Sequence, residues 1–239
     1  MAPIGGVRSA VLSDLEDGGI AIPDSVTNQW PMDEGSGSTV EDIKGTRDLT
    51  LEGPSWDDGY LLFDGTDDFA TDDNDDSYFT DVSDFSVFGW LRPTSTEQGG
   101  FLGSYSVSGG QRSWQLRWVD RDDVGENQQL EILYSRDGSE AITDHSESYS
   151  YDWEVDSWFS FAITRDGDTG NIRFYHDGEH RATADGASGS INANTRKFAL
   201  GGVTDRSSPH FEGYMRDTVF AKETTLSNDD ISDLHSATE

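Results

Sequence analysis

Three carboxylates gather around one predicted turn of the chain. Residues 63–69 read Phe-Asp-Gly-Thr-Asp-Asp-Phe, a pattern typical of a strand, a tight turn and a second strand. Calcium takes roughly six to eight oxygen ligands, chiefly from carboxylates and backbone carbonyls. The turn therefore predicts Asp64, Asp67 and Asp68 as candidate ligands of a structural calcium ion.

An acidic run follows this turn and superficially resembles an EF-hand loop. Its Asp72-x-Asn74-x-Asp76 spacing matches the first ligand positions of such a loop. The position that needs glycine for a sharp turn is Ser77, and the position that needs a bidentate glutamate is Ser83. The EF-hand pattern fails, and we expect a solvated acidic loop instead.

Residues that could catalyse hydrolysis are weakly represented. Glycosidases use two carboxylates about 5–10 Å apart, and the nearest candidate pair is Glu154-x-Asp156. With 47 Asp and Glu in 239 residues, such pairs arise by chance. His176 and His180 flank an Asp-Gly turn, but two imidazoles without a third ligand make a weak metal site. No Ser-His-Asp spacing or phosphate loop is present, so the sequence favours a protein that is not an enzyme.

Aromatic residues offer a different chemistry, because sugar-binding surfaces use rings as stacking platforms. Trp114 and Trp118 share one face of a predicted strand, and Tyr151 lies in a later aromatic stretch. Core packing is the more frequent use of such rings. The candidates for a ligand-binding surface are Tyr105, Trp114, Trp118 and Tyr151.

The charge of the chain restricts its habitat and its partners. It carries 47 Asp and Glu against 16 Lys and Arg, for a net charge of −31 and a pI near 4.1. Such a domain repels itself, and molar salt, with a Debye length of about 3 Å, screens that repulsion. We therefore expect a protein adapted to concentrated salt, with an acidic protein that binds a basic partner as the alternative. Nucleic acid is not an expected partner, because phosphate binding needs a basic stripe.

The elements that must position these residues are predicted to be strands. From residue 28 onward, short alternating apolar runs recur between clusters of Gly, Asp, Asn and Ser. In the run 85–92 apolar side chains occupy both faces, which indicates a central strand covered on both sides. Ser227 is a predicted N-cap of one closing helix, with Ile231 and Leu234 on its apolar face. The sequence thus predicts an all-β sandwich with a short C-terminal helix.

The first 26 residues read as a separate arm. They lack the basic n-region and the apolar h-region of a secretory signal. No apolar run in the chain approaches the roughly 20 residues of a membrane-spanning helix, so membrane insertion is not expected. We predict an arm or anchor segment over residues 1–26 and a β domain over residues 27–239.

The order of these motifs resembles the laminin-G-like, concanavalin-A-like jelly-roll family. The similarity covers about residues 28–235 and implies two antiparallel sheets, often one calcium ion, and frequent roles in glycan or protein adhesion. It also implies core positions for Trp30, Trp56, Trp90 and Trp158. The residues that carry the similarity are Trp30, Asp33-Glu-Gly-Ser-Gly37, Gly53-Pro-Ser-Trp56, Phe63 to Phe69, Phe85-Ser-Val-Phe-Gly-Trp-Leu-Arg-Pro93, Trp158-x₃-Ala162-x₂-Arg165-Asp-Gly167, Arg173-Phe-Tyr-His-Asp-Gly178, Leu200-Gly-Gly202, Phe211-Glu-Gly213 and Leu226-Ser227-x₃-Ile231-x₂-Leu234.

The resemblance extends the calcium prediction to a later strand. It implies that Glu212 and Asp217 lie near the turn of Asp64. Relatives usually carry two adjacent acids in that strand, whereas this chain has Arg216 followed by Asp217. The alternative to calcium is therefore an acidic turn whose carboxylates pair with the guanidinium of Arg216. The resemblance also weakens the hydrolase interpretation, since Trp158 stands where catalytic relatives carry a third acid.

Together these features predict a non-catalytic structural protein on the virion surface of a halophile virus. We expect residues 1–26 to bind other virion proteins, and the β domain to form a homo-oligomer and to contact host surface glycans or glycoproteins. One alternative is a carbohydrate-binding adhesin of a haloarchaeal cell, located extracellularly or at the cell surface. The other alternative is a polysaccharide hydrolase or lyase.

Overall fold

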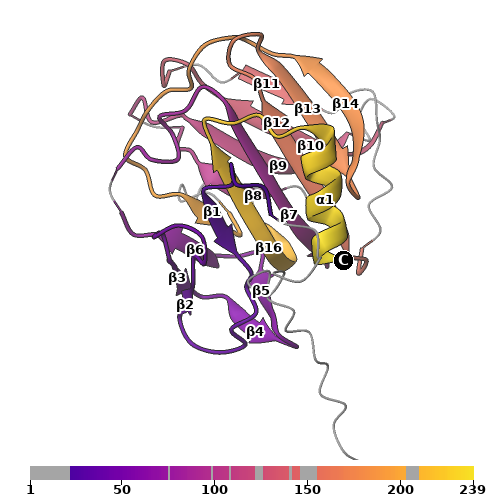
Figure 1. Ribbon diagram of the computed structural model, residues 1–239. Helices are drawn as coiled ribbons and strands as arrows, with labels where there is room; N and C mark the ends of the chain where they lie inside the picture. The colour runs from indigo at the N-terminus through magenta and orange to yellow at the C-terminus, as the bar shows by residue number, and fades with distance from the viewer. Residues whose placement is uncertain are drawn as a thin grey trace, which may run out of the picture.

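The computed structural model describes residues 22–74, 76–97, 99–107, 109–121, 126–139, 142–145, 155–202 and 210–239. Two antiparallel sheets of eight strands each face one another, and one helix lies against the outside of the first sheet (Figure 1). The all-β prediction with a single closing helix is confirmed for this part of the chain.

Sheet A carries the helix on its outer face. Its strands follow the order β14-β13-β12-β7-β16-β5-β4, with β1 paired to β16. Their bounds are β1 Asn28–Trp30, β4 Ser55–Asp57, β5 Tyr60–Asp64, β7 Phe85–Pro93, β12 Phe159–Arg165, β13 Asn171–His176, β14 Glu179–Asp185 and β16 Glu212–Lys222.

Sheet B closes the other side of the sandwich. Its strands follow the order β11-β10-β9-β8-β15-β6-β3-β2. Their bounds are β2 Thr39–Val40, β3 Leu49–Glu52, β6 Phe69–Asp72, β8 Gly99–Ser104, β9 Trp114–Arg121, β10 Glu126–Tyr134, β11 Ile142–His145 and β15 Ala199–Leu200.

The core between the sheets is rich in aromatic rings. Trp30 and Phe198 stack at a centroid distance of 5.6 Å, and Trp114 stacks on Phe220 at 6.1 Å. Trp30 and Trp114 are both fully buried. Because aromatic side chains bury a large apolar area each, these rings supply the hydrophobic stabilisation that the many charged residues cannot.

A second apolar cluster lies outside sheet A, beneath the helix α1 Asn228–Thr238. Strand β7 connects the two clusters, because Val87 and Leu91 face the core while Phe88 and Trp90 face the helix. The prediction that this strand is covered on both sides is therefore confirmed. Ile231 also belongs to the outer cluster, as its predicted place on the apolar helix face requires.

Two local signals fix the helix against the sheet. Ser227 is the N-cap, as the sequence predicts, and it forms a capping box with Asp230. The β13–β14 hairpin turns through Asp177 and Gly178, both with positive φ (49° and 72°), which is the geometry that Asp-Gly favours. A Cβ on Gly178 would lie 2.9 Å from the Cβ of His235, so glycine allows the hairpin to approach the helix closely.

The described end of the predicted arm packs on the domain. Val26 is 2% exposed and belongs to the outer apolar cluster, against which Ile22 also packs. The backbone N–H of Thr27 donates to the carbonyl oxygen of Phe220 at 2.9 Å. Packing of the domain thus includes residues from 22 onward, whereas residues 1–21 lie outside the described part. No helix in the described residues is long and apolar enough to cross a membrane.

Candidate functional site

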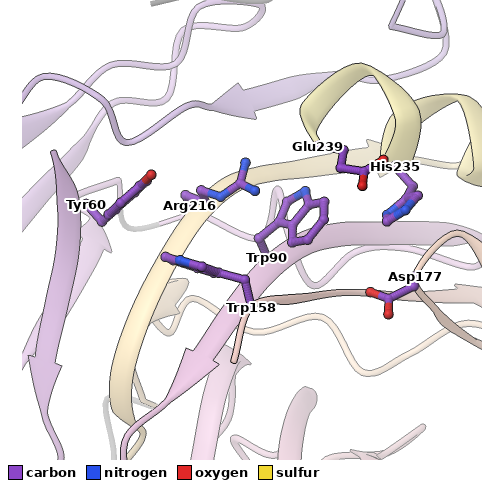
Figure 2. A pocket seen from close by; sticks show the side chains of 7 residues that line it. All are labelled: Tyr60, Trp90, Trp158, Asp177, Arg216, His235 and Glu239. Atoms are coloured by element: carbon purple, nitrogen blue, oxygen red, sulfur yellow. The ribbon is translucent and has the colours of Figure 1, made fainter. Parts of the chain in front are cut away.

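A pocket of about 370 Å³ opens on the outer face of sheet A, beside the end of α1. Figure 2 shows aromatic side chains and Arg216 at one end and acidic side chains with His235 at the other. The residues that line it are Tyr60, Trp90, Trp158, Asp177, Arg216, His235 and Glu239.

The strand register brings these side chains to one face. Trp90 of β7 pairs with Ser160 of β12 on one side and with Arg216 of β16 on the other. Two residues further along the same ladder, Arg92 pairs with Tyr214. Because side chains alternate along a strand, Arg92 shares the outer face with Trp90. The outer face of sheet A therefore presents neighbouring rows of rings and guanidinium groups.

The end of the helix is attached to the floor of the pocket. The indole Nε1 of Trp90 donates to Thr238 Oγ1 at 2.6 Å, and its ring stacks on His235 at 5.2 Å. Arg216 Nη1 donates to the carbonyl oxygen of Thr238 at 2.6 Å and contacts a carboxylate oxygen of Asp217 at 2.5 Å. These contacts hold the rings and the guanidinium in fixed positions.

The aromatic end of the pocket combines stacking surfaces with positive charge. The rings of Tyr60 and Trp158 lie 5.0 Å apart, and both side chains are only partly buried. The guanidinium carbon of Arg216 lies 4.3 Å from the Trp90 ring centroid and 5.2 Å from that of Trp158. These distances are those of cation–π contacts, which fix the guanidinium planes relative to the rings.

The opposite end of the pocket is acidic. Asp177 accepts a hydrogen bond from the backbone N–H of Ser160 at 2.9 Å, and its other oxygen lies 3.5 Å from His176 Nδ1. Burial lowers the pKa of His176, and the charge of Asp177 offsets part of that shift. Glu239 adds a second, exposed carboxylate. Carboxylate oxygens accept hydrogen bonds from hydroxyl groups, so this end can orient a polyhydroxylated ligand.

A serine and a histidine meet beside the pocket, although the sequence showed no triad spacing. Ser160 Oγ and His235 Nδ1 are 2.9 Å apart. Ser160 is 1% exposed and does not line the pocket. A nucleophile must reach its substrate, whereas this hydroxyl is covered, so the contact attaches α1 to β12.

The predicted calcium turn brings three of its five candidate ligands together. Ligand oxygens of Asp64, Asp67 and Asp68 all lie within 4.8 Å of one another. The Asp64 N–H donates to Asp68 Oδ2 at 2.9 Å. Burial raises the pKa of Asp68, the hydrogen bond from Asp64 lowers it, and the neighbouring charges of Asp64 and Asp67 raise it. The donor set fits an oxygen-seeking cation, which these three carboxylates would hold.

The two candidate ligands on β16 differ from each other. Glu212 pairs with Asp64 across the β5–β16 ladder, so it lies next to the turn as predicted. Asp217 lies five residues further along β16, roughly 16 Å away at strand spacing, where the β7–β16 register shifts. The structure therefore does not bring Asp217 to the turn of Asp64, Asp67 and Asp68. Arg216 contacts Asp217 and Thr238, so it does not pair with the turn carboxylates either.

The predicted aromatic ligand surface is wrong for the three rings that the structure describes. Tyr105, Trp114 and Trp118 are 3%, 0% and 2% exposed. Trp114 and Trp118 both lie on the inner face of β9. Trp114 Nε1 donates to the carbonyl oxygen of Phe79 at 2.6 Å. Rings buried in this way cannot stack on a sugar. Tyr151 lies outside the described residues.

The remaining chemical candidates do not assemble either. Glu154 lies outside the described residues, and Asp156 is an exposed residue whose N–H donates to the carbonyl oxygen of Pro93. In the β13–β14 ladder His176 pairs with Glu179, while His180 Nε2 lies 2.9 Å from Thr183 Oγ1. The two histidines are thus engaged separately.

The pocket itself was missed by the sequence interpretation. The sequence interpretation places Trp90 and Trp158 at core positions, and it considers Arg216 only as a replacement for calcium. One signal could have found the pocket: Trp90-x-Arg92 and Tyr214-x-Arg216 each place an aromatic residue and an arginine on the same strand face. The pairing of β7 with β16 that joins these two motifs is not visible in the sequence.

Comparison with known proteins agrees with this architecture. The sequence profile of the concanavalin A-like lectin/glucanases superfamily (Laminin_G_3) matches residues 63–232, more than half of the chain. The chain belongs to this superfamily. The resemblance seen in the motifs of the sequence is therefore confirmed at the level of family and fold. No curated protein sequence matches the chain.

Solved structures that share this fold include proteins in complex with sugars. Domain 4 of AbnA, a GH43 extracellular arabinanase from Geobacillus stearothermophilus, in complex with arabinotriose, is 17% identical with a TM-score of 0.60, covering 88% of this superfamily member and 98% of that chain. The binding domain of botulinum neurotoxin DC in complex with SialylT is 14% identical with a TM-score of 0.65. The match covers 92% of this chain and 53% of that one. Trypanosoma rangeli sialidase in complex with sialic acid is 15% identical with a TM-score of 0.61. The match covers 90% of this chain and 33% of that one. The chain thus spans about half or less of the toxin and sialidase chains, and these identities establish the fold alone.

Proposed function

We propose that this domain binds glycans non-catalytically, through the pocket on the outer face of sheet A. The observation that carries the proposal is the partly exposed ring pair of Tyr60 and Trp158, 5.0 Å apart at the pocket edge. Sugar rings present apolar C–H faces and equatorial hydroxyls, and a pocket with a few convergent polar groups beside aromatic rings suits both. Solved domains of this fold in complex with arabinotriose and SialylT support the choice of ligand.

The absence of hydrolysis is part of the proposal. Asp177, one of the two carboxylates of the pocket, is already engaged by the protein: one oxygen accepts the Ser160 N–H at 2.9 Å and the other lies 3.5 Å from His176 Nδ1. The hydroxyl of Ser160 is covered. A binding role without turnover is therefore the function that these side chains suit best.

We further propose that the domain works in concentrated salt at a virion surface, with a calcium ion on the turn of Asp64, Asp67 and Asp68. The net charge of −31 supports the saline habitat, and the clustered carboxylates support the ion. The test of location is to fractionate halophile virions, and host cells before infection, and to detect the chain with an antibody. Detection only in cell-surface fractions of uninfected cells would replace the virion by the cellular adhesin.

The binding proposal is tested with a glycan array and titration calorimetry in molar KCl, using the wild type and Trp158→Ala. We expect Trp158→Ala to weaken binding about ten-fold or more, because the stacking ring is lost. Trp56→Ala is the matched control. Trp56 lies on the edge strand β4 and does not line the pocket. Its partly buried indole donates to the carbonyl oxygen of Gly37. Equal binding by wild type and Trp158→Ala would reject the pocket, and release of reducing ends from bound glycans would reject the non-catalytic role.

A further inference from the structure

The aromatic surface at one end of the pocket continues beyond the pocket itself. Trp158 lies beside two tyrosine rings, with the Tyr60 centroid 5.0 Å away and the Tyr214 centroid 6.3 Å away. Tyr60 and Trp158 line the pocket, whereas Tyr214 lies outside its lining. All three side chains are partly exposed. Trp158 therefore links a ring inside the pocket to a ring on the surface next to it.

The strands hold the outer ring on the same face as the pocket. On β16 Met215 belongs to the core between the sheets, and its neighbours Tyr214 and Arg216 therefore point to the outer face of sheet A. Across the β7–β16 ladder Tyr214 pairs with Arg92, whose guanidinium carbon lies 4.1 Å from the Tyr214 centroid. Two paired strands thus fix the position of Tyr214 relative to the pocket residue Arg216.

Polar groups of both signs accompany the outer ring. The hydroxyl of Tyr214 donates to Asp57 Oδ2 at 2.7 Å, in a hydrogen bond exposed at the surface. This hydrogen bond raises the pKa of the Tyr214 phenol, as do burial and the charges of Asp57 and Asp156, whereas the charge of Arg92 lowers it. Carboxylates and a guanidinium act at the same ring. The surface around Tyr214 therefore offers both acceptors and donors to the hydroxyl groups of a neutral sugar.

We infer that the glycan bound at this site is a neutral, linear oligosaccharide, with one end in the pocket and the following sugars over Trp158 and Tyr214. The inference rests on the glycan-binding function proposed above and names its ligand class. The pocket, at about 370 Å³, is near the lower end of the roughly 300–1,000 Å³ of small-molecule sites, so a longer chain must leave it. The partly exposed rings of Trp158 and Tyr214 supply a stacking surface where it leaves.

The alternative is a site for a single sugar, with Tyr214 serving only the packing of the sheet surface through Arg92 and Asp57. In that case the affinity does not depend on Tyr214 for any length of chain. In the extended site, Tyr214 contacts only the sugars beyond the pocket, so its removal weakens long chains and spares short ones. Chain length therefore separates the two interpretations.

The experiment measures affinity against chain length by titration calorimetry in molar KCl. The probes are pairs of neutral linear sugars: arabinobiose and arabinohexaose, cellobiose and cellohexaose, and maltose and maltohexaose. The variant is Tyr214→Ala, and Tyr214→Phe keeps the ring but removes the hydroxyl that bonds to Asp57. Trp56→Ala is the control for the loss of an aromatic side chain that does not line the pocket.

We expect the longer sugar of at least one pair to bind more tightly than the shorter one. Tyr214→Ala should weaken the longer sugar about three-fold or more and leave the shorter one unchanged, whereas Tyr214→Phe and Trp56→Ala should keep the wild-type affinities. A longer chain also offers more binding registers, but that statistical gain is equal in wild type and variant. The comparison therefore isolates the contribution of the ring.

The same dependence on chain length in wild type and Tyr214→Ala would overturn the inference, and so would the failure of every pair to bind. Loss of the shorter sugar in Tyr214→Ala would place Tyr214 in the packing of the pocket and also overturn it. In each case the glycan-binding function stands if Trp158→Ala still weakens the glycans that the array identifies. Sugar binding that is indifferent to Trp158→Ala would overturn the proposed function itself.

Discussion

The indole of Trp90 donates its Nε1 proton to the hydroxyl oxygen of Thr238, 2.6 Å away, and so joins the middle of β7 to the last turn of α1. Both residues are nearly buried, at 5% and 8% exposed. The Thr238 hydroxyl in turn donates to the carbonyl oxygen of Leu234 at 2.8 Å. This short chain of hydrogen bonds fixes the helix end that forms one wall of the pocket.

Replacing Thr238 by valine should therefore destabilise the domain and loosen the pocket. The variant keeps the shape of the side chain but leaves the buried Trp90 Nε1 without its acceptor, which costs about 1–3 kcal/mol in the free energy of unfolding. Denaturant unfolding in molar KCl measures this change. Ser236→Ala removes an exposed hydroxyl of the same helix, bonded to the Ser232 carbonyl oxygen, and should cost much less. Equal costs in the two variants would contradict the role given to Thr238.

The fold could be predicted because its determinants are local or periodic. The alternation around Val87 and Phe88 predicts the two-sided strand, and the N-cap Ser227 predicts where the helix begins. Asp177-Gly178 gave a turn that the structure forms. Each of these signals depends on residues within a few positions of one another, where propensity and hydrogen bonding act directly.

The site could be predicted only where one turn supplies it. Asp64, Asp67 and Asp68 come together because they share a turn, whereas the pocket needs Trp158 and Arg216 from strands far apart in the sequence. The alternation of side chains along β9 predicts that Trp114 and Trp118 share a face, but it does not predict which face is buried. That choice is made by sheet pairing, which depends on the rest of the sandwich.

Salt should stabilise this protein into the molar range. With a net charge of −31, mutual repulsion of carboxylates destabilises the compact state at low ionic strength, and screening relieves it. We expect the melting temperature to rise between dilute buffer and molar KCl. An uncharged osmolyte at matched osmolality is the control, since it changes water activity without screening. A flat or falling melting temperature in KCl would contradict adaptation to salt.

Calcium should stabilise the domain through the acidic turn. An ion held by Asp64, Asp67 and Asp68 relieves their mutual repulsion, and binding to the folded state alone adds about 2.7 kcal/mol at a hundred-fold excess over Kd. A chelator should then lower the melting temperature of the wild type but not of Asp64→Ala. Asp233→Ala removes an exposed helix carboxylate and should keep the sensitivity to chelator. A wild type that melts identically with calcium and with chelator would reject the ion.

His176 should make stability fall on mild acidification. Its folded pKa is lowered, because burial disfavours the charged imidazole, while the unfolded chain keeps a value near 6.5. As pH drops below about 7, the unfolded state therefore takes up a proton that the folded state resists, and the free energy of unfolding decreases until the folded pKa is reached.

The measurement for His176 is the free energy of unfolding between about pH 7.5 and pH 5 in molar KCl, for wild type and His176→Gln. The many carboxylates titrate in both proteins, so their contribution cancels in the difference. We expect the wild type to lose stability relative to His176→Gln as the pH falls. His180→Gln, which removes an exposed imidazole bonded to Thr183, should follow the wild type. If the difference between wild type and His176→Gln stays constant across this range, then Asp177 compensates the burial of the imidazole fully, and the acidic end of the pocket does not resist its protonation.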